Sequence, residues 1–261
     1  MIHSLNPTIK AITVILPAIL LSFSFDIITP AIMFIYILIL TFFFSKLNIK
    51  KWLFYFIPMS FFALGLAWMT MLYTDDKYAT GPIVFSFFSF DIRTGSIIVS
   101  MSLALRSLCF IGLSLLFAFT TDPTKFMLSL MQQVRLSPKL TYGILAGYRF
   151  VPTFKHELDL LKKAHRVRGL GRAKGWRNRV EHTRQYFIPL LAGAIRKAER
   201  VAIAMESKGF TGSKDRTYYT VMKIKATDYL FFIIMLIILI IAYYVSYRLG
   251  TLNIFGHRIM P

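Results

Sequence analysis

The chain has 261 residues, of which 56% are hydrophobic and 16% are charged, and its formal net charge is +19. An average soluble domain has about 25% charged residues, so this apolar content exceeds what a soluble fold of the same size can bury. The composition therefore excludes an ordinary soluble enzyme and indicates an integral membrane protein. The basic excess alone would also suit a nucleic-acid binder, so the placement of the charges decides between these classes.

Five segments are apolar over the length of about 20 residues that a membrane crossing needs. They lie near residues 8–24, 28–44, 52–73, 96–119 and 227–247. The first has no basic region before it and no small-residue cleavage site, so we expect a retained span and not a removable signal peptide.

The orientation follows from the basic residues, because Lys and Arg near span ends resist translocation. Lys46, Lys50 and Lys51 follow the second predicted span, and a long basic stretch follows the fourth. Both predict a cytoplasmic N-terminus, and five crossings then place the C-terminal tail outside the cell. Arg248, directly after the last span, counts mildly against this orientation.

Most of the charge lies in one internal stretch. Residues 120–225 hold 22 of the 31 Lys and Arg residues but only 7 of the 12 acidic ones. We therefore predict an all-α polytopic membrane protein with a membrane domain of four spans at 1–119, a cytoplasmic basic helical domain with crossing long helices at 120–226, and the last span with a short extracellular tail at 227–261.

The basic stretch predicts three helices, at about 123–134, 138–169 and 180–207. Asp122 and Ser137 each precede a proline, which is the pattern of an N-cap followed by proline at the first helical position. Pro152 lies inside the second predicted helix and removes a backbone donor there, so we expect a kink.

The second and third predicted helices end alike, with a small or apolar residue, a cation and a glycine. The two endings are Val167-Arg168-Gly169 and Ser207-Lys208-Gly209. Ordinary capping accounts for either ending alone, because glycine favours the C-terminal cap and a cation suits the negative end of the helix dipole. Together they predict one cationic side chain at each helix tip.

Small residues recur in the third predicted helix at Ala194, Ala198 and Ala202. A spacing of four residues puts them on one face, where they let another helix cross closely. The second predicted helix is one candidate for this crossing, which would hold the two cationic tips at a fixed separation.

Two features of the membrane part are less regular. Arg106 lies within the fourth span, where a charge is costly, so we expect it to pair with Asp91 or a helix carbonyl, or else to face a partner or a transported substrate. The aromatic segment 85–90 is too short to cross a membrane, and we expect an interfacial or re-entrant piece.

The sequence offers no catalytic motif. It contains no P-loop, no H-E-x-x-H, no G-x-S-x-G and no paired Asp-rich motif for Mg²⁺, and its one cysteine, Cys109, excludes an intramolecular disulfide. We therefore expect neither an enzyme nor a cofactor or metal site in this chain. The basic run from Arg166 to Arg184 suits anionic lipid, and Trp176 is its only aromatic residue, so we expect no nucleic-acid partner.

Taken together, the motifs resemble the transmembrane T-component of energy-coupling factor transporters, the CbiQ-like membrane subunits of vitamin and transition-metal uptake systems. The residues that carry the resemblance are Asn6-Pro7-Thr8-Ile9-Lys10, Thr120-Thr121-Asp122-Pro123, Tyr148-Arg149-Phe150-Val151-Pro152, Ala164 to Gly169, Ala198-Glu199-Arg200 and Ala204 to Gly209.

The resemblance implies a coupling subunit of the prokaryotic cell membrane. In that family, two short x-Arg-x motifs at the ends of cytoplasmic helices dock on a pair of ABC-type ATPases, which bind ATP and Mg²⁺. The same helices cradle a separate substrate-binding membrane subunit, the S-component. Carried over, the docking motifs are Val167-Arg168-Gly169 and Ser207-Lys208-Gly209, where Lys208 departs from the usual arginine and lacks its bidentate fork.

Two other classes remain as alternatives. A polybasic membrane scaffold would bind anionic lipid without energy coupling, and neighbouring genes for ATPases would argue against it. A secondary transporter would carry the substrate itself, but no pair of spans shows an internal repeat or a buried acid–base relay. Transport by the chain alone would favour this last class.

Overall fold

The computed structural model describes residues 2–45, 47–74, 82–87, 90–168, 176–254 and 257–258. The chain forms two compact units, one made of Met1–Ser129 with Met222–Pro261 and the other of Leu130–Val221. We call them the membrane unit and the hairpin unit and describe each by itself.

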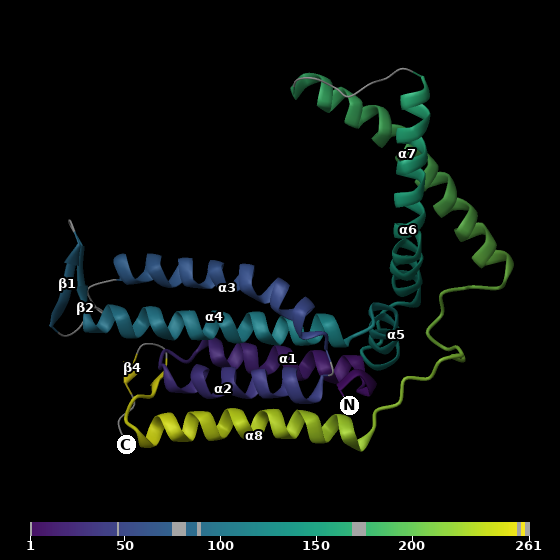
Figure 1. Ribbon diagram of the computed structural model, residues 1–261. Helices are drawn as coiled ribbons and strands as arrows, with labels where there is room; N and C mark the ends of the chain where they lie inside the picture. The colour runs from purple at the N-terminus through teal and green to yellow at the C-terminus, as the bar shows by residue number, and fades with distance from the viewer. Residues whose placement is uncertain are drawn as a thin grey trace. The chain divides into compact units, whose positions relative to one another are not determined.

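Apolar helices build the membrane unit (Figure 1). A short 3-10 turn, Ile2–Ser4, precedes them, and they are α1 (Pro7–Ser22), α2 (Ile28–Ile39) with its π-helical continuation Leu40–Phe44, α3 (Ile49–Leu72), α4 (Thr94–Thr120) and α8 (Ala226–Arg248). Each predicted span coincides with one of them. By length and composition α3, α4 and α8 can each cross a membrane, whereas α1 and the helix Ile28–Phe44 are apolar but shorter. The predicted all-α polytopic membrane fold is confirmed.

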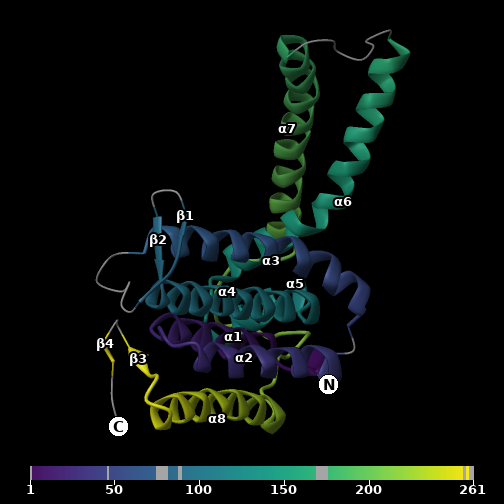
Figure 2. The same cartoon turned by 60° about the vertical axis from the view of Figure 1, so that its left-hand side comes forward.

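The helices of this unit lie side by side, with α1 and α2 between α4 and α8 (Figures 1 and 2). Helix α4 contacts α1, α2 and α3, and α8 contacts α1 and α2. Their shared core consists of buried apolar side chains from α1, α2, α4 and α8, among them Leu21, Met33, Ile37, Cys109, Leu113, Leu116, Met235, Leu239 and Ala242.

Hydrogen bonds between helix ends fix the relative directions of three of these helices. The backbone N–H of Asn6, just before α1, donates to Asp228 at the start of α8, and Lys10 near the start of α1 donates to the carbonyl of Thr120 at the end of α4. Helices α1 and α8 therefore run parallel and α4 runs opposite to both. These are the directions that five alternating crossings would give.

Gly112 lets α2 and α4 approach closely. A Cβ at this position would lie 2.9 Å from Cγ2 of Ile37, a branched side chain that is fully buried and has little rotamer freedom. In membrane proteins, small residues at helix crossings allow this kind of close backbone approach.

We expect Gly112→Ala to destabilise the membrane unit by about 1–3 kcal/mol, because the added methyl overpacks the contact with Ile37. Gly65→Ala is the matched control, since a Cβ on Gly65 would meet nothing within 4 Å and alanine is the better helix former. Thermal unfolding in detergent should show a lower midpoint for Gly112→Ala alone. Equal midpoints for both variants would contradict a tight α2–α4 crossing.

A β-hairpin precedes α4. Strand β1 (Ile83–Phe87) pairs antiparallel with β2 (Phe90–Arg93), with Ser86 opposite Asp91 and an irregularity between Ile83 and Phe85. The expectation of an interfacial or re-entrant piece did not include this pairing. The expectation considered segment 85–90 by itself, whereas pairing with a second strand satisfies the backbone hydrogen bonds of both strands. A second short ribbon, β3 (Asn253–Ile254) with β4 (His257–Arg258), follows α8.

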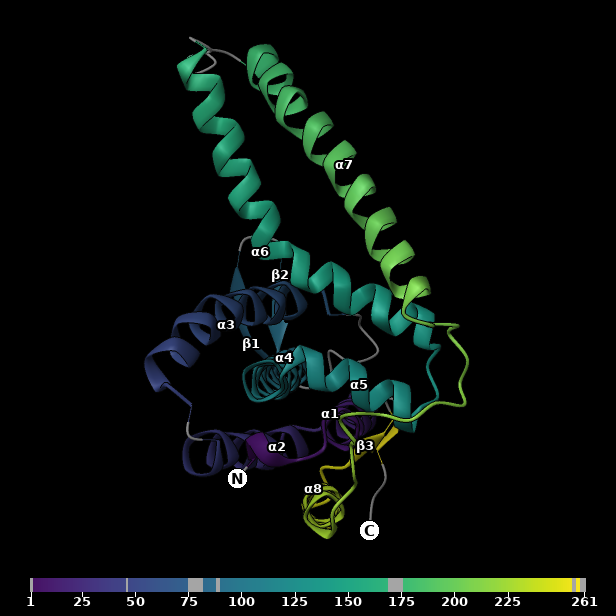
Figure 3. The same ribbon diagram turned by 90° about the vertical axis from the view of Figure 1, so that its right-hand side faces the viewer.

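Two long helices form most of the hairpin unit, α6 (Pro138–Val167) and α7 (Trp176–Ser207), and α5 (Pro123–Gln133) lies across the boundary between the units. Asp122 caps α5 as predicted, because its carboxylate accepts from the backbone N–H of Thr124 at 2.7 Å. Ser137 precedes Pro138 as expected but makes no capping hydrogen bond. Helix α6 contains Pro152 and bends along its length (Figure 3).

Candidate functional site

Helices α6 and α7 run antiparallel. Tyr142 near the start of α6 lies 5.5 Å, between ring centroids, from Phe210 after α7, and His165 near the end of α6 lies 4.9 Å from Tyr186 near the start of α7. Between these contacts, Glu157 and Lys197 form an ion pair. The C-terminal ends of the two helices, which carry the predicted docking motifs, therefore lie at opposite ends of the hairpin.

The end of α7 is a Schellman cap. Gly209 has φ +78°, its N–H donates to the carbonyl of Glu206 at 2.9 Å, and the N–H of Phe210 donates to Met205 at 3.0 Å. This 5→2 and 6→1 pattern needs a left-handed residue, which is why glycine follows the cation. Lys208 is thereby presented, exposed, on the last turn.

The end of α6 presents the other cation. The N–H of Arg168 donates to the carbonyl of Ala164 at 3.1 Å, so Arg168 closes the helix, and both Arg168 and Val167 are exposed, Val167 at 89%. Gly169, the third residue of this motif, lies outside the described residues. Within the described part of the hairpin unit, neither Arg168 nor Lys208 is paired with a carboxylate.

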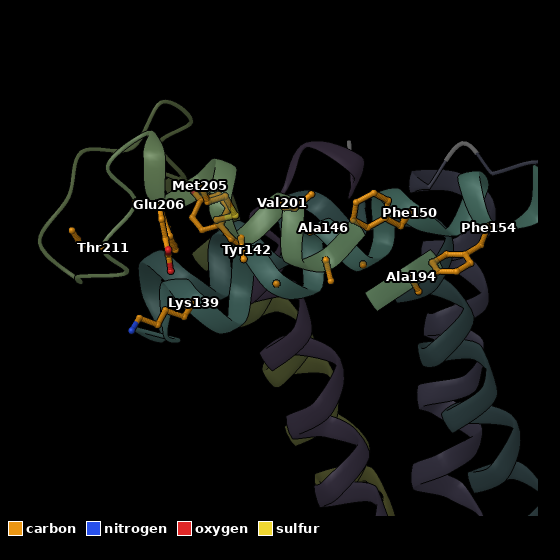
Figure 4. Close-up of a pocket in the computed structure, with 15 residues that line it drawn as sticks. Lys139, Tyr142, Ala146, Phe150, Phe154, Ala194, Val201, Met205, Glu206 and Thr211 are labelled. Carbon is orange, nitrogen blue, oxygen red and sulfur yellow. The ribbon is translucent and has the colours of Figure 1, made fainter. Parts of the chain in front are cut away.

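A groove of about 540 Å³ lies between α6 and α7 (Figure 4). All three alanines of the predicted ridge line it. The facing wall comes from α6, and it contains small residues and aromatic rings that the sequence analysis did not single out: Tyr142, Gly143, Ala146, Gly147, Phe150 and Phe154. The spacing of Gly143 and Gly147, four residues apart, is the signal that could have revealed this wall.

The groove stays open along its small residues. A Cβ built on Gly143 or Gly147 would meet nothing within 4 Å, and Ala198 and Ala202 are exposed. The two sets of small residues thus face each other across free space. The groove between α6 and α7 can therefore accept an apolar segment of another chain.

One end of the groove is held by cation–π contacts. Arg216, in the segment after α7, lies 5.0 Å from the ring centroid of Tyr142 and 5.2 Å from that of Phe210. Such contacts are worth about 0.5–2 kcal/mol. They tie the chain after α7 back to the start of α6 at that end of the groove. Lys139 and Glu206 provide charged groups there (Figure 4).

Arg106 has a structural role in the membrane unit. Its Nη1 donates to the carbonyl of Ser22 at 3.1 Å, and its guanidinium lies 4.8 Å from the ring centroid of Phe25. The expectation of a helix carbonyl as partner is confirmed. In the described residues, no group of three or more His, Cys, Asp or Glu side chains could hold a metal ion.

The fold and the site define a polytopic α-helical membrane protein that carries a basic hairpin of two long amphipathic helices with an open apolar groove. The family model of CbiQ, described as cobalt transport protein, matches residues 1–219. The chain therefore belongs to the CbiQ family of membrane transport components.

Curated relatives agree with this assignment. The chain is 26% identical over 233 residues to the energy-coupling factor transporter transmembrane protein EcfT of Bacillus subtilis, with 84% of each chain covered. It is 26% identical to EcfT of Lactococcus lactis, with 92% of each covered, and 27% identical to EcfT of Streptococcus thermophilus, with 94% of each covered. The likeness thus extends over most of both chains.

Proposed function

We propose that this protein is the transmembrane coupling subunit of an energy-coupling factor importer of the ABC type. It transmits ATP-driven motion from two cytoplasmic ATPases to a separate substrate-binding membrane subunit. The observation that carries the proposal is the pair of exposed cations, Arg168 and Lys208, at opposite ends of one helical hairpin.

The hairpin suits two separate docking contacts. Helix α6 has 30 residues and α7 has 32, which at 1.5 Å per residue corresponds to about 45 Å of helix. Each end offers a cation on a capped helix turn, positioned by backbone hydrogen bonds. An acidic groove on each of two ATPases would accept these side chains. ATP and Mg²⁺ would be bound by the ATPases, and this chain would contribute no cofactor and no catalytic residue.

The groove suits the other partner. Its two facing walls are mostly apolar and carry Gly and Ala residues, which allow a helix backbone to approach closely. A helix of the substrate-binding membrane subunit is the element that would occupy it. Because that subunit would hold the substrate, a vitamin or a transition-metal ion, this chain need not recognise it.

The orientation follows from this role. The ATPases are cytoplasmic, so the hairpin unit and the N-terminus would face the cytoplasm of the prokaryotic cell and the C-terminus the outside. Exposed Lys50 and Lys51 at the start of α3 agree with this side. Anionic lipids would contact the remaining basic residues of the hairpin at about 1 kcal/mol per cation, and no nucleic acid would be bound.

Purification of the tagged chain in mild detergent from its native membrane tests the proposal. We expect ABC ATPases and a small apolar membrane protein to co-purify and to be identified by mass spectrometry. Recovery of the chain without an ATPase in several mild detergents would overturn the proposal. The polybasic lipid scaffold would then be the leading alternative.

Filling the groove should separate its role from that of the helix ends. We expect Ala198→Trp to weaken recovery of the substrate-binding subunit about 5- to 150-fold, since overpacking costs about 1–3 kcal/mol, while the ATPases remain bound. Ala204→Trp is the matched control, because Ala204 is exposed on the same helix and does not line the groove. Equal recovery with both variants would argue against docking in the groove.

A further inference from the structure

The segment Asn6–Lys10 at the start of α1 makes hydrogen bonds that reach far along the chain. Thr8 Oγ1 donates to Ser129 Oγ at 2.8 Å, and the Asn6 side-chain amide donates to the carbonyl of Lys223 at 3.4 Å. Lys10 Nζ donates to the carbonyl of Thr120 at 3.0 Å. This segment therefore contacts the chain at three places more than 100 residues away.

Two of these places are where the chain leaves and re-enters the membrane unit. Ser129 is the last residue before the hairpin unit begins at Leu130, and the chain returns at Met222, directly before Lys223. The membrane-unit residues on both sides of the hairpin unit are thus bonded to residues of one helical turn. Thr120 is the last residue of α4 and Asp122 directly precedes α5, so both lie on the approach to the first of these places.

The polar and charged side chains that meet at the start of α1 are costly to bury, and we call them the α1 polar cluster. Asn6, Thr8, Lys10, Ser129 and Asp228 are each at most 5% exposed, and Lys10 and Asp228 are charged residues at 1%. The ammonium of Lys10 meets the last carbonyl of α4, and the carboxylate of Asp228 lies in the first turn of α8 and accepts from the N–H groups of Asn6 at 2.9 Å and Lys225 at 2.7 Å. Each charge thus faces the helix end that favours it.

Helix capping accounts for only some of the hydrogen bonds in the α1 polar cluster. The Asn6 side chain accepts from the N–H of Thr8 at 3.1 Å, which is the N-cap bond of α1. Capping needs neither the Thr8–Ser129 bond nor the bond from Asn6 to Lys223. These bonds connect α1 to Ser129 and Lys223, the membrane-unit residues that flank the hairpin unit in the sequence.

We propose that Asn6–Lys10 is a positioning segment, an anchor that fixes the two points where the chain leaves and re-enters the membrane unit to the helices α1, α4 and α8. With both points fixed, displacement of the chain at Ser129 or Lys223 moves these membrane helices instead of being absorbed within the membrane unit. The mechanical role of the anchor rests on the coupling function proposed above. The existence of the anchor rests only on the hydrogen bonds of Asn6–Lys10.

The anchor is tested on the chain alone, in nanodiscs. In a Cys109→Ala background, spin labels on Ile12→Cys and Lys125→Cys, both exposed in the membrane unit, report the distance between α1 and α5. We expect Thr8→Val with Lys10→Met to widen the distance distribution at least twofold. Thr13→Val is the matched control, since among the described residues the Thr13 hydroxyl bonds within α1, to the Ile9 carbonyl at 2.8 Å. An unchanged distribution in the double variant would overturn the anchor.

The mechanical role is tested in the complete reconstituted complex. The Thr8→Val, Lys10→Met variant should retain its partners and its ATP hydrolysis but lose at least tenfold in substrate taken up per ATP hydrolysed, while Thr13→Val behaves as the unchanged chain does. Normal uptake per ATP despite a widened distance would overturn the mechanical role. If the unchanged chain binds no ATPase, the proposed coupling function fails, and the spin-label distance still decides on the anchor.

Discussion

Reversing both cations of the hairpin, Arg168→Glu with Lys208→Glu, is expected to lower ATPase recovery at least 100-fold and to abolish coupled uptake. Truncating one partner of a buried charge pair costs about 2–5 kcal/mol, and reversal adds repulsion between like charges. Because the two sites lie at opposite ends of the hairpin, their effects should be close to additive. The quantity of ATPase that co-purifies with the tagged chain measures the loss.

The two sites should differ in strength. Arg168 can offer a carboxylate a bidentate guanidinium, whereas Lys208 offers a point charge, so Arg168→Glu alone should cost more than Lys208→Glu alone. For the same reason Lys208→Arg should hold its ATPase at least as tightly as the unchanged chain. These comparisons need only the single variants and the same co-purification measurement.

A matched control separates docking from lipid binding. Lys155→Glu with Lys162→Glu changes the net charge by the same amount, on exposed positions within α6 and away from its end. Binding to anionic vesicles should fall similarly in the two double variants, but ATPase recovery should fall only in the first. Equal ATPase loss in both would contradict specific docking at the helix ends and favour a general electrostatic attraction.

Removing the carboxylate of Asp26 is expected to cause the largest loss of stability in the membrane unit. Asp26 is 3% exposed, and its Oδ2 accepts from the N–H of Thr29 at 2.8 Å, from the Thr29 hydroxyl at 2.6 Å and from Ser246 Oγ of α8 at 2.6 Å, while its Oδ1 accepts from Ser24. Asp26→Ala leaves these donors unpaired in a buried place. We expect a cost of about 3–5 kcal/mol.

The single cysteine provides the measurement. Cys109 is fully buried in α4, so its reaction with a fluorogenic maleimide during heating reports opening of the membrane core. Asp26→Ala should react at clearly lower temperature than the unchanged chain, and Ser246→Ala, which removes one donor, should shift by less. Asp159→Ala on exposed α6 is the control and should not shift. If Cys109 reacts at the same midpoint temperature in Asp26→Ala as in the Asp159→Ala control, the hydrogen bonds of Asp26 do not stabilise the membrane unit as proposed.

Local patterns made several features predictable from the sequence. Each apolar run became a helix because a backbone in lipid must satisfy its hydrogen bonds within the segment. The N-cap at Asp122 and the glycine after Lys208 depend on neighbours within a few residues, so short motifs were enough to place them. Helix α7 begins at Trp176, four residues before the expected start. The ends of helices are harder to predict from sequence than the helices themselves.

The tertiary structure decided which residues meet. Asn6 contacts Asp228 across 222 positions, and Asp26 contacts Ser246 across 220, so no local pattern could reveal either cluster. The pairing of β1 with β2 likewise required a partner strand, and the groove required the facing walls of α6 and α7. By itself the sequence determined the membrane class, the helices and the two cationic helix ends, because these depend on composition and local backbone chemistry. Only the tertiary structure placed Arg168 and Lys208 at opposite ends of an antiparallel pair of helices. It also decided that buried polar groups join distant helices, because packing between segments sets both.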